Sequence, residues 1–153
     1  MAILRHIFAS ILVCVATPGC AGPSVRFAPF NSVDAPQPQV TDVAIEIRPG
    51  DKTYLTKGAP KVLGWISSKG DLGDEAIGTA ACVEAAKRGG THILLRSSKK
   101  EFDVNDVPLG PIGTQQIDES ERATYVVLRV EPEKWSTLPD VLQPKPATKK
   151  DGK

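Results

Sequence analysis

The chain has 153 residues, of which 41% are hydrophobic and 24% are charged, and its formal net charge is +1. This length allows one globular domain with an apolar core of its own. The balanced charge excludes the strongly basic surface on which nucleic-acid binding depends, so we expect no nucleic-acid partner.

Residues 1–19 have the organisation of a bacterial export signal. Arg5 precedes an apolar stretch from Ile7 to Ala16, and small residues lead from there to Cys20. As a helix this stretch is about 15 Å long, half of a hydrocarbon core of about 30 Å, so it is too short to cross a bilayer. Residues 1–19 are therefore predicted to be a lipoprotein signal peptide that is removed on export.

The residues before Cys20 resemble the lipobox of bacterial lipoproteins. Gly19 and Cys20 match its last two positions, whereas Thr17 and Pro18 depart from the usual residues. The resemblance implies that Cys20 is acylated and anchors the mature chain. Ala21 lacks the acidic character associated with inner-membrane retention, which implies an outer-membrane protein facing the periplasm. The alternative is ordinary cleavage near residue 20, which releases a soluble periplasmic or secreted protein.

Residues 20–40 are predicted to be a Pro-rich tether, because they hold too few aliphatic side chains to offset the entropy of ordering them. Their prolines are Pro23, Pro29, Pro36 and Pro38. Phe27 and Phe30 are the exceptions, and we expect them to dock on the domain or on lipid headgroups.

Residues 41–134 are predicted to form the folded domain, which begins with two strands. Val43 to Arg48 alternates apolar and mostly polar residues, which indicates a strand with one buried face. Lys61 to Ser67 is apolar on both sides, and Gly64 within it indicates a bulge or a close approach of another backbone.

A helix is predicted to begin near Asp74 and to end at about Arg88, where Gly89-Gly90 stops it. Its small residues recur on one face, which allows the helix to lie close to the sheet. These small residues are Gly78, Cys82, Ala85 and Gly89. Glu84, Lys87 and Arg88 lie on the opposite face.

Cysteine usage agrees with this organisation. Cys14 lies in the signal peptide and Cys20 carries the lipid, so only Cys82 remains in the folded part. No intramolecular disulfide is then available, despite an oxidising compartment. We expect Cys82 to be an inert, packed thiol, because it lies in the middle of the small-residue face.

Two further strands are predicted at His92 to Arg96 and at Ala123 to Val130. Between them, residues 102–122 mix proline, glycine, acidic and amide residues, and we expect a long binding loop or a disordered excursion. Residues 135–153 are rich in proline and end in lysines, so a disordered basic tail is predicted. Contact of this tail with anionic envelope polymers is a weaker hypothesis.

The element order is β-β-α-β-β, which predicts an α+β fold: a two-layer sandwich of one helix on a four-stranded mixed sheet. The helix is a crossover that can place the second and third strands parallel. Which strands pair otherwise is left open by the sequence.

The segment from Val62 to Leu95 resembles small envelope lipoproteins, among them the outer-membrane lipoprotein that senses damage in the Rcs stress pathway. The matching pieces are Leu63-Gly64 on a strand, Ala81 to Ala86 on a helix, and Gly89 to Leu94 leading into an apolar strand. The resemblance implies a shared fold. The stress sensor uses disulfides within its domain, which this chain with Cys82 alone cannot form.

No catalytic, cofactor or metal site is expected. His92 is the only histidine of the mature chain, and we interpret it as a structural side chain. Asp103 to Asp106 is similar to the start of a calcium loop, but Pro108 stands where glycine is required. Gly110 to Gly113 lacks the lysine and the following helix of a phosphate-binding loop.

The sequence therefore predicts a non-enzymatic envelope lipoprotein, held in the membrane through Cys20, that presents a small interaction, structural or sensor module. Its partner is expected to be another envelope protein, bound by the 102–122 loop or by a sheet edge. The alternative is a periplasmic small-ligand binder or enzyme built on acidic residues of that loop and on His92.

Overall fold

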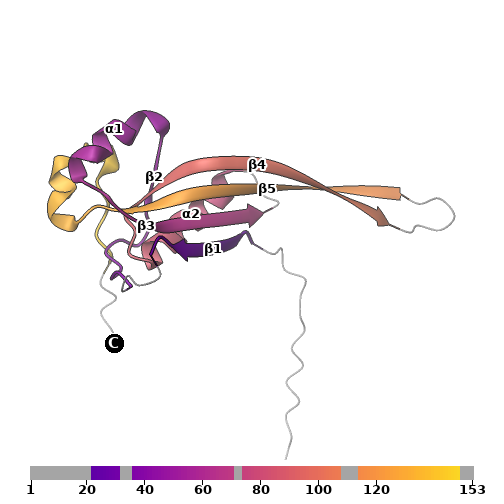
Figure 1. Ribbon diagram of the computed structural model, residues 1–153, viewed down its shortest axis with the longest axis horizontal. Coiled ribbons are helices and arrows are strands. Elements are labelled where there is room, and N and C mark those ends of the chain that lie inside the picture. The colour runs from indigo at the N-terminus through magenta and orange to yellow at the C-terminus, as the bar shows by residue number, and fades with distance from the viewer. Residues whose placement is uncertain (1–21, 32–35, 71–73, 108–113, 149–153) are drawn as a thin grey trace, which may run out of the picture.

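A computed structural model describes residues 22–31, 36–70, 74–107 and 114–148. These residues form an α+β domain around one mixed five-stranded sheet, with the strand order β1-β3-β5-β4-β2 (Figure 1). The strands are β1 (Ser24–Pro29), β2 (Ile45–Ile47), β3 (Lys61–Gly70), β4 (His92–Val107) and β5 (Thr114–Arg129). The helices are α1 (Lys52–Leu55) and α2 (Asp74–Lys87), with 3-10 turns at Pro49–Asp51, Thr56–Gly58, Pro132–Thr137 and Asp140–Leu142.

The helix α2 connects β3 to β4, and these two strands run parallel, as the crossover predicts. They are not neighbours, however, because β5 lies between them and is antiparallel to both. β2 pairs in parallel with the first residues of β4, His92 to Leu94. All the predicted strands and the predicted helix are present, so the prediction of an α+β fold with a mixed sheet is confirmed.

The expected irregularity at Gly64 is confirmed. The pairing of β3 with β5 shifts between Val62 and Gly64. A Cβ atom at Gly64 would collide with the carbonyl oxygen of Ala28 and would lie 2.8 Å from the Phe27 ring. Glycine is therefore required at this position because β1 approaches it closely.

The prediction of an unstructured tether is wrong for Ser24–Pro29, which forms β1 and pairs with β3. Val25 and Phe27 are partly buried against the core under α2. Two apolar side chains at period two suffice to dock this segment, and β1 is an edge strand, where proline is tolerated. The sheet consequently has five strands and not the predicted four.

The predicted loop at residues 102–122 is also wrong over the described residues, because this segment extends β4 and β5 as a hairpin. The predicted disordered tail is wrong up to residue 148. Leu138 and Leu142 are buried, and Ala147 N–H donates to Val40 O at 2.9 Å. The chain end is thus packed on the domain by spaced apolar residues among its prolines.

Both faces of the sheet are covered, which the two-layer prediction did not include. One core lies under α2 and contains Ile66, Ala85 and Val127 among others. A second core, containing Leu55 and Leu142, joins the opposite face of the sheet to α1 and the C-terminal turns. The last residues of β5 are therefore buried on both faces. Each fully buried aliphatic side chain contributes about 1.5–3 kcal/mol.

Among the described residues, no helix is long and apolar enough to cross a membrane.

Candidate functional site

The first candidate site is a two-stranded extension of the sheet. β3 ends at Gly70, which pairs with Glu121 of β5. Beyond that level β4 and β5 continue alone through residues 101–107 and 114–120, and we call this hairpin the β4–β5 arm. It projects well past the rest of the domain (Figure 1).

Charged pairs fix the register at the base of the arm. Glu101 lies 3.3 Å from Lys69 Nζ on β3 and 3.4 Å from Arg122 Nε on β5. Lys100 Nζ lies 3.2 Å from Glu119 Oε1 across the hairpin. Exposed pairs of this kind contribute about 0–1 kcal/mol each. They therefore align β4 with β5 and with β3 more than they stabilise the fold.

One face of the arm carries three exposed apolar side chains beside the charged Glu119. Val104 and Ile117 are direct cross-strand neighbours, and Phe102 lies two residues before Val104 on the same face. The side chains of Val104, Ile117 and Phe102 are 56%, 65% and 61% exposed respectively. We call these three residues the arm patch. Large exposed apolar side chains that gather on one face are typical of a binding surface.

The strand edges of the arm are also unpaired within the described part of the chain. β2 pairs with β4 only at His92 to Leu94, and no other described strand pairs with the outer edge of β4 along the arm. Residues 114–120 of β5 pair with β4 alone. Such edges bind an additional strand through backbone hydrogen bonds.

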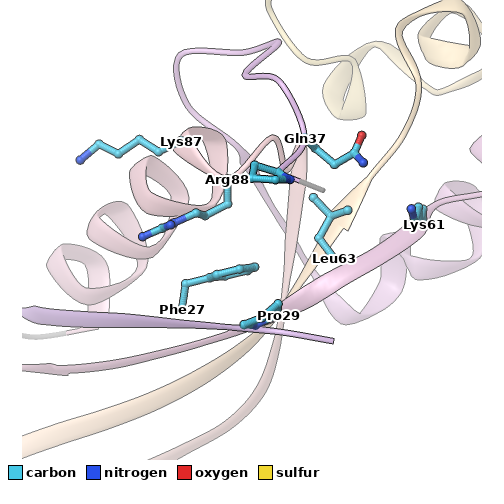
Figure 2. A pocket seen from close by; sticks show the side chains of 8 residues that line it. Phe27, Pro29, Gln37, Lys61, Leu63, Lys87 and Arg88 are labelled. Atoms are coloured by element: carbon cyan, nitrogen blue, oxygen red, sulfur yellow. The ribbon is translucent and has the colours of Figure 1, made fainter. Parts of the chain in front are cut away.

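A second candidate is a pocket of about 340 Å³ among β1, the start of β3 and the end of α2. Figure 2 shows Phe27, Pro29 and Leu63 on its sheet side, with Arg88 and Gln37 opposite them. None of the described residues that line this pocket is acidic.

Arg88 closes the pocket over the Phe27 ring. Its guanidinium carbon lies 5.4 Å from the ring centroid, within the range of a cation–π contact. Arg88 Nε donates to Glu84 Oε1 at 2.9 Å. Lys87 Nζ lies 3.8 Å from the same carboxylate, and in Figure 2 its side chain points away from the other lining residues. One carboxylate thus offsets part of the charge of two cations.

His92 is fully buried, and both ring nitrogens are engaged. Nε2 lies 2.8 Å from the carbonyl oxygen of Leu142, which only accepts, so Nε2 carries the proton. Nδ1 then accepts from Thr91 Oγ1 at 2.8 Å, and Thr91 Oγ1 accepts from Val130 N–H at 2.9 Å. Burial lowers the pKa of His92, and the hydrogen bond to Leu142 opposes this shift. Burial and two engaged ring nitrogens are what a structural histidine requires.

Cys82 is buried in the core under α2, as predicted. Burial, with a smaller contribution from the negative charge of Glu46, raises the pKa of its thiol to about 12. The thiolate is therefore almost absent at neutral pH, and a nucleophilic role is not supported.

Across the described residues, no group of three or more His, Cys, Asp or Glu side chains is arranged to hold a metal ion. The side chains of Asp103 and Asp106, and the segment from Gly110 to Gly113, lie outside the described residues. Cys20 and the signal peptide also lie outside them, so acylation of Cys20 stays a prediction.

Residues 102–122 were predicted to be a binding loop, but neither their apolar side chains as a patch nor the pocket was identified from the sequence. The alternation of Phe102 and Val104 with charged residues was a usable signal for a strand with an apolar face. The pocket had no such signal, because Phe27, Leu63 and Arg88 are far apart in the chain.

Comparison with protein-family models, with curated proteins and with solved structures finds no match to this chain.

Proposed function

We propose that this protein is a non-enzymatic, membrane-anchored module of the bacterial envelope that binds another envelope protein through its β4–β5 arm. The arm patch carries the proposal. Two cores bury most of the aliphatic residues elsewhere on the sheet, whereas Phe102, Val104 and Ile117 are exposed together on a projecting hairpin. The kinship with envelope lipoproteins suggested by residues 62–95 is part of the same proposal.

The position of β1 brings the domain close to its anchor. β1 begins at Ser24, so an acylated Cys20 is followed by only three residues before the sheet. Four residue steps reach at most about 14 Å. The domain is then held at the membrane surface, and not at the end of a long tether as the prolines of residues 20–40 suggested.

The arm projects from the same end of the sheet at which the chain enters β1 (Figure 1). Ser24 is level with Lys69, Arg122 and Lys99 on the neighbouring strands. Val104 lies five residues farther along β4, which is about 17 Å at strand spacing. The arm patch therefore lies about as far beyond the level of Ser24 as the acylated Cys20 can lie. A partner bound to the arm patch is then in or beside the same membrane.

The chemistry of the arm fits a protein strand. The outer edge of β4 in the arm, which no described strand covers, supplies backbone hydrogen bonds, and the arm patch supplies apolar contact on one face. A partner with an exposed strand and an apolar face would extend the sheet. The alternative of an enzyme built on the acidic residues of 102–122 is less well supported, since Glu119 pairs with Lys100 across the hairpin and Glu121 accepts a hydrogen bond from Ser98 Oγ.

The test uses the tagged full-length protein in its own envelope, with the arm variant Phe102→Ser/Val104→Thr/Ile117→Thr. The matched control is Tyr54→Ser/Val141→Thr, two exposed apolar residues outside the arm. After chemical cross-linking and neutral-detergent extraction, we expect the arm variant to recover at least about tenfold less of a specific partner than the control does. Equal recovery by both variants would contradict the proposal.

The anchor is tested separately with Cys20→Ser. We expect this variant to leave the membrane fraction, whereas the arm variant stays in it. An unmodified chain that is recovered free of the membrane would overturn the anchoring part of the proposal and leave the arm test standing.

A further inference from the structure

We propose that the pocket between Phe27 and Arg88 binds a small organic carboxylate with an apolar body. This site lies under the end of α2 and is separate from the β4–β5 arm, so the inference does not depend on the function proposed above. Its volume of about 340 Å³ is at the lower end for ligand pockets, which span about 300–1,000 Å³. A ligand of one or two rings, or a short acyl chain, matches this size.

The sheet side of the pocket is apolar and rigid. The rings of Phe27 and Pro29 lie beside the Leu63 side chain in Figure 2. The Phe27 ring holds its place over Gly64, where any Cβ atom would displace it. Because β1 is paired along its whole length with β3, the pocket floor is part of the sheet itself.

The opposite wall is also fixed. Arg129 is buried, and its Nη1 donates to Pro38 O at 2.9 Å and to Gly89 O at 3.0 Å. Its Nε donates to Glu131 Oε1 at 3.0 Å. These bonds hold the segment that carries Gln37 against the end of α2. A pocket that is formed before the ligand arrives binds it with little loss of conformational entropy.

The positively charged side chains at the pocket favour an anionic ligand. Lys61 lines the pocket and has no ion pair among the described residues, and Arg88 lies on the other side of the opening. Arg88 uses Nε–H for Glu84, so its terminal nitrogens still have N–H donors for a ligand. An apolar body against Phe27 and Leu63 and a carboxylate toward Arg88 and Lys61 satisfy both parts of the site.

The test is calorimetric titration of the mature chain, residues 20–153, with 2-naphthoate and with octanoate, which distinguish an aromatic from an acyl body. The neutral control ligand is naphthalene-2-methanol. Lys61→Glu and Arg88→Gln remove charge at the pocket, whereas Lys52→Glu makes the same change on α1, over the opposite face of the sheet.

We expect saturable binding of at least one carboxylate, weakened about tenfold or more by Lys61→Glu or Arg88→Gln and unchanged within about twofold by Lys52→Glu. The neutral alcohol should bind about tenfold more weakly than 2-naphthoate. Lys61 is exposed, so its variant is expected to fold even if Arg88→Gln does not. Absence of saturable binding by both carboxylates, or equal affinity in Lys61→Glu and Lys52→Glu, would overturn the proposal.

Discussion

Val104 and Ile117 face each other directly across the β4–β5 arm, and more than half of each side chain is exposed to solvent. The apolar cross-strand pair of Ile93 and Val127, in the body of the sheet, is by contrast completely buried. The arm pair therefore contributes little to the hydrophobic stabilisation of the free protein. Its apolar surface is available to a partner.

The first prediction is that Val104→Thr/Ile117→Thr changes the free energy of unfolding by less than about 0.5 kcal/mol, because both positions are exposed and threonine retains strand propensity. The control is Val127→Thr, where a hydroxyl enters the core and costs about 1–3 kcal/mol. Urea denaturation measures both. A loss in the arm variant as large as that in Val127→Thr would show that the arm patch is needed for folding.

The second prediction concerns the thiol of Cys82. With its pKa raised to about 12, the thiolate fraction at pH 8 is about one in ten thousand. A chromogenic disulfide reagent should therefore leave Cys82 unmodified in the folded protein for hours and modify it at once in urea. Rapid labelling of the folded chain would mean that the thiol is accessible.

The third prediction is a dependence of stability on pH that comes from His92. Its pKa is lowered in the folded state, so the unfolded chain binds the proton more tightly. The contribution of neutral His92 to the free energy of unfolding should be fully present above about pH 6.5, the pKa of histidine in the unfolded chain. It should decrease as the pH falls toward the lowered pKa of the folded state.

His92→Gln should remove this dependence between about pH 7.5 and pH 5.5 and lower stability by about 1–3 kcal/mol at pH 7.5, since the acceptor of Leu142 is left poorly paired. Urea denaturation at several pH values measures both effects. If the free energy of unfolding decreases equally with falling pH in the variant and in the natural chain, the titrating group is not His92.

The fourth prediction is that Gly89→Ala destabilises the fold by about 1–3 kcal/mol. Gly89 has φ +80°, and a Cβ atom there would lie 2.6 Å from Gln37 Cβ. Gly50→Ala is the matched control, because a Cβ atom at Gly50 meets nothing within 4 Å. Thermal denaturation distinguishes them, and equal midpoints would contradict the close contact at Gly89.

Local periodicity was enough to predict much of this fold. The small-residue face of α2 and the Gly89-Gly90 stop each correspond to an observed feature. The alternation at Val43 to Arg48 marked a strand that in the structure covers only Ile45–Ile47, and Val43 is exposed. Gly64 was informative because a glycine inside an apolar strand marks a bulge or a close backbone approach. These signals depend on residues close together in the chain.

The missed features depend on distant residues. β5 inserts between β3 and β4, and no local pattern states which strands become neighbours. The prolines of residues 20–40 led to the prediction of a tether in place of β1, although Val25 and Phe27 are enough to dock this strand beside β3. Leu138 and Leu142 are isolated in a polar, Pro-rich segment, and they are buried only because the second face of the sheet receives them. The pocket likewise exists only after β1 has docked.

The measurement that tests the central claim most directly is site-specific photo-cross-linking in living cells, with a photoreactive residue at Ile117 or at Val141. The two positions have similar exposure, 65% and 72%, and only Ile117 lies on the arm. We predict one discrete, membrane-associated adduct from Ile117 and none of that mass from Val141. No adduct from Ile117, or the same set of adducts from both positions, would contradict the proposal that the arm is the binding surface.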